Sequence, residues 1–131
     1  MLRIQNQRRF TMSLSTHQPA SVELTDFPIA PEQIISGDPV AKIWVSAQTE
    51  DLKVTQGVWD CTAGDFNWDY DWDEFVLILE GEATIEEIGG ETVTLRAGDF
   101  GYMSIGTKTK WHVPEYIRKT FTLRTPEPLQ L

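Results

Sequence analysis

Between Gly64 and Gly81 the chain reads GDFNWDYDWDEFVLILEG. Acidic and aromatic residues alternate over the first half of this stretch, a pattern typical of a strand or loop with one solvated face. Residues 75–79 then form the longest continuous apolar run of the chain, and its length suits a buried strand. The stretch therefore predicts short β-strands.

A similar pattern of short apolar segments continues from residue 40 to the end of the chain. Short β-branched and aromatic runs alternate with Gly, Asp and Pro at steps of roughly ten residues, and no segment keeps a 3.6-residue apolar period. Gly89-Gly90 predicts a two-residue hairpin with positive φ at both centres. The predicted strands are residues 41–47, 54–60, 66–70, 74–79, 83–88, 91–95, 100–103, 109–113 and 116–123. Many short strands with evenly spaced turns indicate a sandwich, barrel or jelly roll.

The first part of the chain has a different character. Residues 1–20 are polar and without periodicity, so we expect a disordered or flexible tail, with its arginines either tethering an anionic surface or belonging to a disordered extension. Residues 21–39 predict an extended arm with one short helical turn near residues 32–34. The predicted domain comprises residues 21–131.

Composition excludes several classes of function. The net charge of −9 repels a phosphate backbone, so we expect no nucleic-acid partner. No apolar run approaches the ~18 residues that a membrane span needs. The single cysteine, Cys61, cannot form an internal disulfide, and we expect it to be buried and structural. We therefore expect a cytoplasmic protein.

The central stretch resembles the first motif of the cupin superfamily, in which two histidines precede a glutamate that is followed seven residues later by a glycine. Glu74 and Gly81 have this separation. Downstream, Gly98-Asp99-Phe100 and Gly106 resemble the second motif, with Ser104 where a proline usually stands. Further segments are similar to a branch of small cupins grouped with ureidoglycine aminohydrolase and the ethanolamine-utilisation cupin: Gly57-Val58-Trp59, Trp68-Asp69-Tyr70, Leu79-Glu80-Gly81-Glu82, Leu95-Arg96-Ala97-Gly98-Asp99 and Ile117-Arg118-Lys119. The resemblance covers about residues 41–125 and implies a single all-β cupin-type double-stranded β-helix, that is, a jelly-roll barrel.

Cupin enzymes hold a divalent metal through imidazoles and a carboxylate that converge inside the barrel. The motif positions of the histidines hold other residues here, and the chain contains only His17 and His112. Because side chains alternate along a strand, His112 has the opposite parity to Thr109, Trp111 and Val113 and should face solvent or a partner subunit. We therefore predict no metal site and no cofactor.

The predicted pocket is formed by residues at or beside the motif positions that hold metal ligands in cupin enzymes. An aromatic cavity with a few polar groups suits small molecules, and tryptophan faces suit sugars or cationic groups. Glu74 could serve there as an acid, a base or a hydrogen-bond anchor, or it could be a structural carboxylate paired with Lys119. The predicted pocket residues are Glu74, Trp68, Tyr70, Thr109, Trp111 and Lys119, and no catalytic residue is identified. The acidic residues Asp65, Asp69, Asp71 and Asp73 predict a solvated face rather than a calcium site.

Three functions compete on these grounds. The first is metal-independent binding of a small polar metabolite. The second is a metal-dependent enzyme that resembles ureidoglycine aminohydrolase and acts on a small nitrogenous metabolite. The third is a role in assembly, for which the resemblance implies a homodimer that swaps arms formed by residues 21–39. We predict the first function, carried out by a homodimer.

Overall fold

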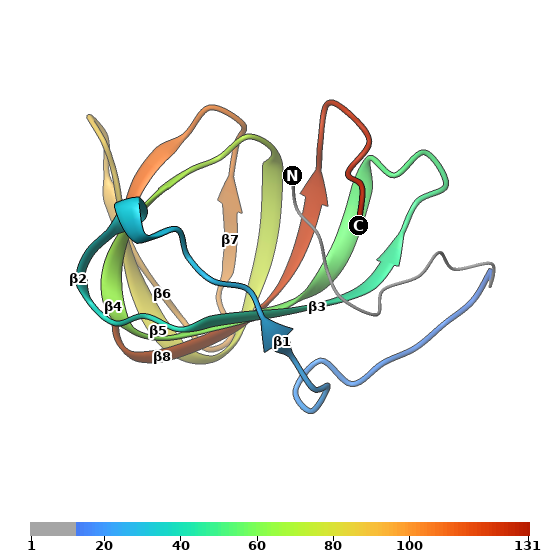
Figure 1. Cartoon of the computed structure of the whole chain (residues 1–131), viewed down its shortest axis with the longest axis horizontal. Coiled ribbons are helices and arrows are strands. Elements are labelled where there is room, and N and C mark those ends of the chain that lie inside the picture. The colour runs from blue at the N-terminus through green and yellow to red at the C-terminus, as the bar shows by residue number, and fades with distance from the viewer. Residues whose placement is uncertain (1–12) are drawn as a thin grey trace.

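The computed structural model describes residues 13–131 and shows a jelly-roll barrel of antiparallel strands (Figure 1). The elements in chain order are β1 (Thr25–Asp26), the 3-10 helix η1 (Pro31–Gln33), β2 (Ile34–Gly37), β3 (Ala41–Gln48), β4 (Val54–Asp69), β5 (Asp73–Glu87), β6 (Thr92–Arg96), β7 (Phe100–Met103) and β8 (Lys108–Arg124). The sheet order is β1-β3-β4-β8-β5-β6, with β2 beside β4 and β7 beside β5. This architecture confirms the predicted all-β jelly roll.

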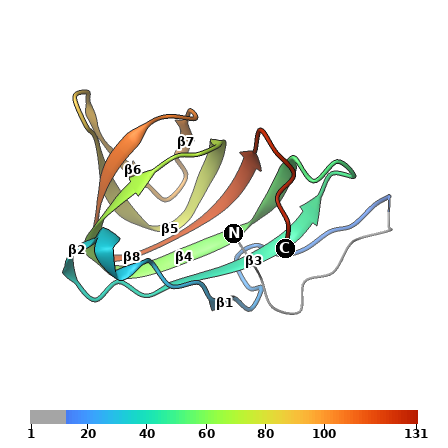
Figure 2. The ribbon, with the colours of Figure 1, turned by 45° about the horizontal axis from the view of Figure 1, so that its top comes forward.

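Three strands are much longer than the sequence pattern predicted. Strands β4, β5 and β8 contain 16, 15 and 17 residues, and each unites two of the predicted short strands. The register of β4 against β8 shifts between Thr62 and Gly64, and that of β5 against β8 shifts between Gly81 and Thr84. Long strands that bend at such irregularities contribute to two walls of the barrel, as Figure 2 shows for β4, β5 and β8.

Proline and glycine at these bends explain why turns were predicted there. Pro114 cannot donate to a strand ladder, and it lies in β8 where pairing with β4 shifts. Gly81 has φ of 74°, and a Cβ atom there would lie 1.8 Å from the carbonyl oxygen of Tyr116. Both residues therefore mark bends within continuous strands instead of chain reversals.

The predicted hairpin at Gly89-Gly90 is present with a different turn. Gly90 N donates to Glu87 O at 2.9 Å, and Glu87 N donates to Glu91 O at 2.9 Å, so residues 88–90 form a three-residue loop. Of the two glycines only Gly89 has positive φ, at 80°. The two-residue turn with two positive φ values was therefore wrong, because Ile88 belongs to the loop.

The N-terminal arm packs on the barrel of its own chain. Strand β1 pairs with β3 and β2 pairs with β4, and η1 lies at the predicted helical turn. Residues 1–12 of the predicted tail lie outside the described residues. Residues 13–20 do not form the free tail that we expected: the His17 ring lies 4.8 Å from that of Trp44, and the Arg118 Nη2 donates to Pro19 O at 2.9 Å.

Side-chain parity organises the interior of the barrel. Thr109, Trp111 and Val113 are buried and His112 is exposed, as alternation along β8 predicts. Cys61 is a buried free thiol, which confirms its expected location. Burial and the neighbouring Asp60 raise the pKa of the Cys61 thiol to about 12, so this thiol is not a nucleophile at neutral pH.

Across residues 13–131, no helix is both long enough and apolar enough to span a bilayer.

Candidate functional site

A buried ion pair occupies the interior of the barrel. Glu74 begins the inner face of β5, and Lys119 lies on β8, where its register partners are Trp59 of β4 and Ile78 of β5. The Lys119 Nζ lies 2.6 Å from Glu74 Oε2. The exposed fractions of the two side chains are 7% and 5%, so bulk water screens this pair little.

Three tryptophans surround the ion pair. The Lys119 Nζ lies 4.7 Å from the ring centroid of Trp59 and 5.0 Å from that of Trp111, which are cation–π distances. The Trp72 Nε1 donates to Glu74 Oε1 at 2.9 Å. Both carboxylate oxygens of Glu74 therefore accept a hydrogen bond from the protein, and the ammonium group contacts two aromatic rings.

A cavity of about 40 Å³ lies against this cluster. Its only charged lining residues within the described chain are Glu74 and Lys119. The other lining residues are Phe27, Ile43, Trp59, Phe66, Trp68, Tyr70, Trp72, Trp111, Phe121 and Leu123. Phe27, Trp68 and Trp72 are half-buried while the remaining aromatic residues are buried, so these three lie toward the mouth of the cavity. The result is a small, mostly apolar pocket with one ion pair at its wall.

Five of the six predicted pocket residues line this cavity, namely Glu74, Trp68, Tyr70, Trp111 and Lys119. Thr109 does not. It is buried, and its Oγ1 donates to the backbone oxygen of Trp68 at 2.7 Å, across the β4–β8 pairing. A short hydroxyl side chain bonds its neighbouring strand in preference to the cavity, so the prediction for Thr109 is corrected to a structural role.

Sequence reasoning missed several lining residues. Trp59 and Trp72 line the cavity but were not among the predicted pocket residues. The two-residue spacing between Trp72, which directly precedes β5, and Glu74 was a usable signal for their hydrogen bond. No comparable signal existed for Phe27, which the arm brings to the cavity from far away in the sequence.

Neither histidine lies at the cavity. His112 Nδ1 lies 2.5 Å from Asp65 Oδ1 on the outer surface, and His17 contacts Trp44. Within residues 13–131, no group of three or more His, Cys, Asp or Glu side chains could hold a metal ion. The side chains at the cavity are also unsuitable as metal ligands, because the only carboxylate among the described lining residues already contacts an ammonium group. The residues therefore do not fit the metal that cupin enzymes carry.

Tyr70 is the buried hydroxyl of the cavity wall, with 2% of its surface exposed. Burial and the nearby negative charge of Glu74 raise the pKa of the Tyr70 phenol well above its usual value, and the neighbouring Trp111 side chain opposes this rise. The phenol therefore remains protonated at neutral pH and can donate a hydrogen bond.

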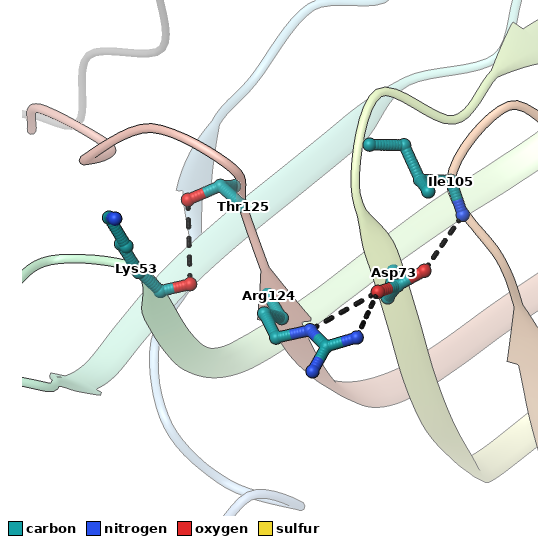
Figure 3. A network of polar contacts seen from close by, with 5 residues as sticks. All are labelled: Lys53, Asp73, Ile105, Arg124 and Thr125. Atoms are coloured by element: carbon teal, nitrogen blue, oxygen red, sulfur yellow. Dashed lines mark hydrogen bonds and ion pairs between the residues drawn. The ribbon is translucent and has the colours of Figure 1, made fainter.

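The acidic run before β5 is less uniform than predicted. Asp69 and Asp71 are exposed, as expected for a solvated face, but Asp73 is buried. Figure 3 shows its carboxylate between Arg124, whose Nη2 lies 2.8 Å away, and the backbone nitrogen of Ile105, at 2.9 Å.

These two contacts hold the pKa of Asp73 below its usual value. Nearby, Thr125 Oγ1 donates to Lys53 O at 3.4 Å. Asp73 therefore ties the end of β8 to the β7–β8 loop, and its prediction as a solvated residue was wrong.

Comparison with known proteins supports the fold. The protein resembles a protein of unknown function of the DUF861 family from Pseudomonas syringae pv. tomato, with a TM-score of 0.72 and 24% identity, over 78% of this chain and 44% of that one. The chain thus spans less than half the length of that protein. It also resembles the EutQ protein of Clostridium difficile, with a TM-score of 0.60 and 17% identity, over 76% of this chain and 81% of that one. A putative ethanolamine utilization protein Q from Salmonella typhimurium has a TM-score of 0.59 and 21% identity, over 88% of this chain and 100% of that one.

At these levels of identity the structural likeness shows a shared fold alone. No curated protein matches the sequence. The sequence of residues 48–121, more than half of the chain, matches the family described as the EutQ-like cupin domain. The chain therefore belongs to the EutQ-like cupin domain family.

Proposed function

We propose that this cupin binds a small polar metabolite in its aromatic cavity without the help of a metal ion. The observation that carries the proposal is the position of the Lys119 ammonium group, 2.6 Å from Glu74 Oε2. A cation covalently attached to β8 thus neutralises the carboxylate at the place where a metal-binding cupin would use its glutamate. This ion pair is the charged point of a cavity that is otherwise mostly apolar.

The charges at the cavity support this reading. A divalent ion beside Glu74 would be repelled by Lys119, and the rings of Trp59 and Trp111 offer no ligand atom to compensate. Removing the positive charge from Lys119 would in turn leave an amine buried among aromatic rings. A bound organic molecule faces neither difficulty, because the ion pair is already neutral overall.

The size and lining of the cavity support a small ligand. A cavity of about 40 Å³ holds a few water molecules, since each needs roughly 10–15 Å³, and therefore a molecule of a few heavy atoms. The half-buried Phe27, Trp68 and Trp72 bound the opening, so displacement of these rings would admit a somewhat larger compound.

The proposal is tested by combining metal analysis with ligand screening. The purified protein is treated with EDTA and examined by thermal shift and by NMR of the tryptophan indole N–H groups against small amides, ureides, sugars and amino alcohols. We expect at least one class of compound to shift the resonances of the cavity tryptophans, equally before and after chelation. Stoichiometric manganese, zinc or iron beside Glu74, or binding that EDTA abolishes and metal restores, would contradict the proposal.

The variant Glu74→Gln tests the carboxylate, with Glu80→Gln on the exposed side of β5 as the matched control. We expect Glu74→Gln to weaken ligand binding and Glu80→Gln to leave it unchanged. If Glu74→Gln lowers stability but leaves binding untouched, Glu74 is a structural residue of the barrel and the ligand is held by the aromatic wall alone.

We also propose that the binding protein is a homodimer. Phe100, Phe75 and Tyr102 have exposed fractions of 84%, 56% and 56% on the outer face of the β5–β7 pair, where Phe75 and Tyr102 are direct partners. Leu77, Thr120 and Thr122 continue this face, and the Asp73–Arg124 ion pair lies at its edge beside Tyr102. A second copy of the chain is the partner that we favour, because two chains of net charge −9 repel each other least where apolar side chains meet.

A further inference from the structure

The cavity has an excess of hydrogen-bond donors. Among residues 13–131, Trp111 Nε1 is the buried side-chain nitrogen or oxygen that lacks a hydrogen-bond partner. Trp111 itself is 2% exposed and lines the cavity. A buried N–H without a partner costs about 1–3 kcal/mol, so such a group is ordinarily paired. The possible acceptors for its hydrogen bond are the Tyr70 hydroxyl oxygen, whose pKa Trp111 lowers, and the contents of the cavity.

A second donor lies beside the first. Tyr70 lines the same cavity, and its hydroxyl oxygen is near enough to accept a hydrogen bond from Trp111, which leaves the Tyr70 O–H free to donate. The phenol stays protonated at neutral pH for the reasons given above. Two neighbouring donors can converge on a single acceptor atom, as the two donors of an anion or carbonyl site do.

The hydrogen-bond acceptors that the protein presents at the cavity already have donors. Glu74 Oε1 accepts from Trp72 and Glu74 Oε2 accepts from Lys119, and no other carboxylate lines the cavity within the described part of the chain. A ligand rich in donors would therefore compete with these internal bonds. A ligand that presents an acceptor would instead satisfy the N–H group that has no partner.

The charges at the cavity indicate whether the ligand is an anion, a cation or a neutral molecule. Glu74 and Lys119 neutralise each other, so an anion would bring an uncompensated charge into an apolar site of an acidic protein. A cation would meet aromatic faces that Lys119 already uses at 4.7 Å and 5.0 Å. A neutral molecule avoids both penalties.

From this balance of donors and charges we infer that the ligand is a small neutral molecule with a carbonyl-type oxygen, held by Trp111 Nε1–H and the Tyr70 hydroxyl. This inference rests on the proposed binding function and specifies the class of ligand. Simple amides and ureides have the required oxygen and fit the volume of the cavity.

Three probes of nearly equal shape and different charge test the inference: acetamide, acetate and acetamidinium. Each is titrated into isotopically labelled protein while the indole N–H resonances of the five tryptophans are followed, the Trp111 resonance being assigned with Trp111→Phe. We expect acetamide to move the Trp111 resonance saturably. We expect acetate and acetamidinium to bind at least roughly tenfold more weakly, because each introduces an uncompensated charge.

Two variants separate the hydrogen bonds from the packing. Trp111→Phe and Tyr70→Phe each remove one donor and keep an aromatic ring, and each should weaken acetamide binding roughly fivefold to tenfold. Trp44→Phe removes an indole that contacts His17 outside this cavity and serves as the matched control, with a change of less than about twofold. Tyr70→Phe gives an answer even if Trp111→Phe does not fold.

The outcomes distinguish this inference from the proposed function. If acetate or acetamidinium binds in the cavity as tightly as acetamide, or if both donor variants bind acetamide normally, the inference is wrong and metal-independent binding stands. If none of the three probes and no compound of the wider screen perturbs the cavity tryptophans, both are wrong.

Discussion

Lys119 Nζ lies 2.6 Å from Glu74 Oε2 inside the barrel, although the two residues are 45 positions apart in the sequence. The two strands that carry them are neighbours, and parity turns both side chains inward. In a fold where the glutamate commonly helps to hold a metal ion, this chain provides an internal counterion instead. The arrangement explains how a carboxylate can remain buried without metal.

The pair predicts a characteristic double-mutant cycle. Lys119→Met leaves Glu74 without its counterion, and Glu74→Gln leaves Lys119 without its counterion, so each should lower the free energy of unfolding by about 3–5 kcal/mol. The double variant removes both charges and should recover most of that loss. Urea unfolding of the four proteins measures the coupling, and strictly additive losses would show that the two charges do not stabilise each other.

The lowered pKa of Asp73 predicts that the stability of the fold depends on pH in the acidic range. Its pKa is below the usual value of 3.8 in the folded protein, chiefly through the Ile105 N–H and Arg124, so it stabilises the fold above pH 4. This contribution is lost as the pH falls through the lowered folded-state value. Asp73→Asn should therefore be less stable than wild type at pH 7, and the difference should shrink below pH 4.

The control for this prediction is Asp71→Asn, which removes the same charge from an exposed position of the same segment. Thermal unfolding at several pH values compares the three proteins. A stability difference between wild type and Asp73→Asn that does not change between pH 7 and pH 3 would contradict the assignment of the carboxylate.

Two glycines with similar backbone angles predict different responses to substitution. Gly81 and Gly89 have φ of 74° and 80°, so alanine is strained by a similar amount at either position, about 1–2 kcal/mol. A Cβ at Gly81 would also lie 1.8 Å from Tyr116 O, whereas nothing lies within 4 Å of a Cβ at Gly89. Gly81→Ala should therefore lower the free energy of unfolding much more than Gly89→Ala, as measured by chemical unfolding. Equal losses would mean that the bend of β5 does not require the close approach of Gly81 to the Tyr116 backbone.

The exposed aromatic residues of the outer face predict how the proposed dimer can be broken. Phe100→Asp places a carboxylate on the exposed face around Phe75 and Tyr102, and we expect it to convert the dimer to a monomer in light scattering coupled to gel filtration. Val93→Asp, at another exposed apolar position, should leave the dimer intact. A wild-type protein that is monomeric at micromolar concentration, or a dimer that survives Phe100→Asp, would contradict this interface.

Local patterns were sufficient for much of the barrel. The alternation of Thr109, Trp111 and Val113 correctly predicted which side chains face inward, because strand geometry alone sets that periodicity. The apolar run at residues 75–79 correctly indicated a strand but not a wholly buried one, since Phe75 is exposed on the outer face. The same parity argument placed His112 outside. The patterns failed at Pro114 and Gly81, since the signals for a bend within a strand and for a turn between strands are the same residues.

The sequence by itself determined the fold class, the inward faces of the strands and the shortage of metal ligands, since these depend on residue type and on spacing along one strand. Only the tertiary structure decided that Thr109 bonds the neighbouring strand, that Phe27 reaches the cavity from the arm, and that Trp111 is left with an unpartnered N–H. These features depend on which atoms of distant segments meet within hydrogen-bond distance. Such distances arise from pairing register and side-chain packing, which no pattern within one strand encodes.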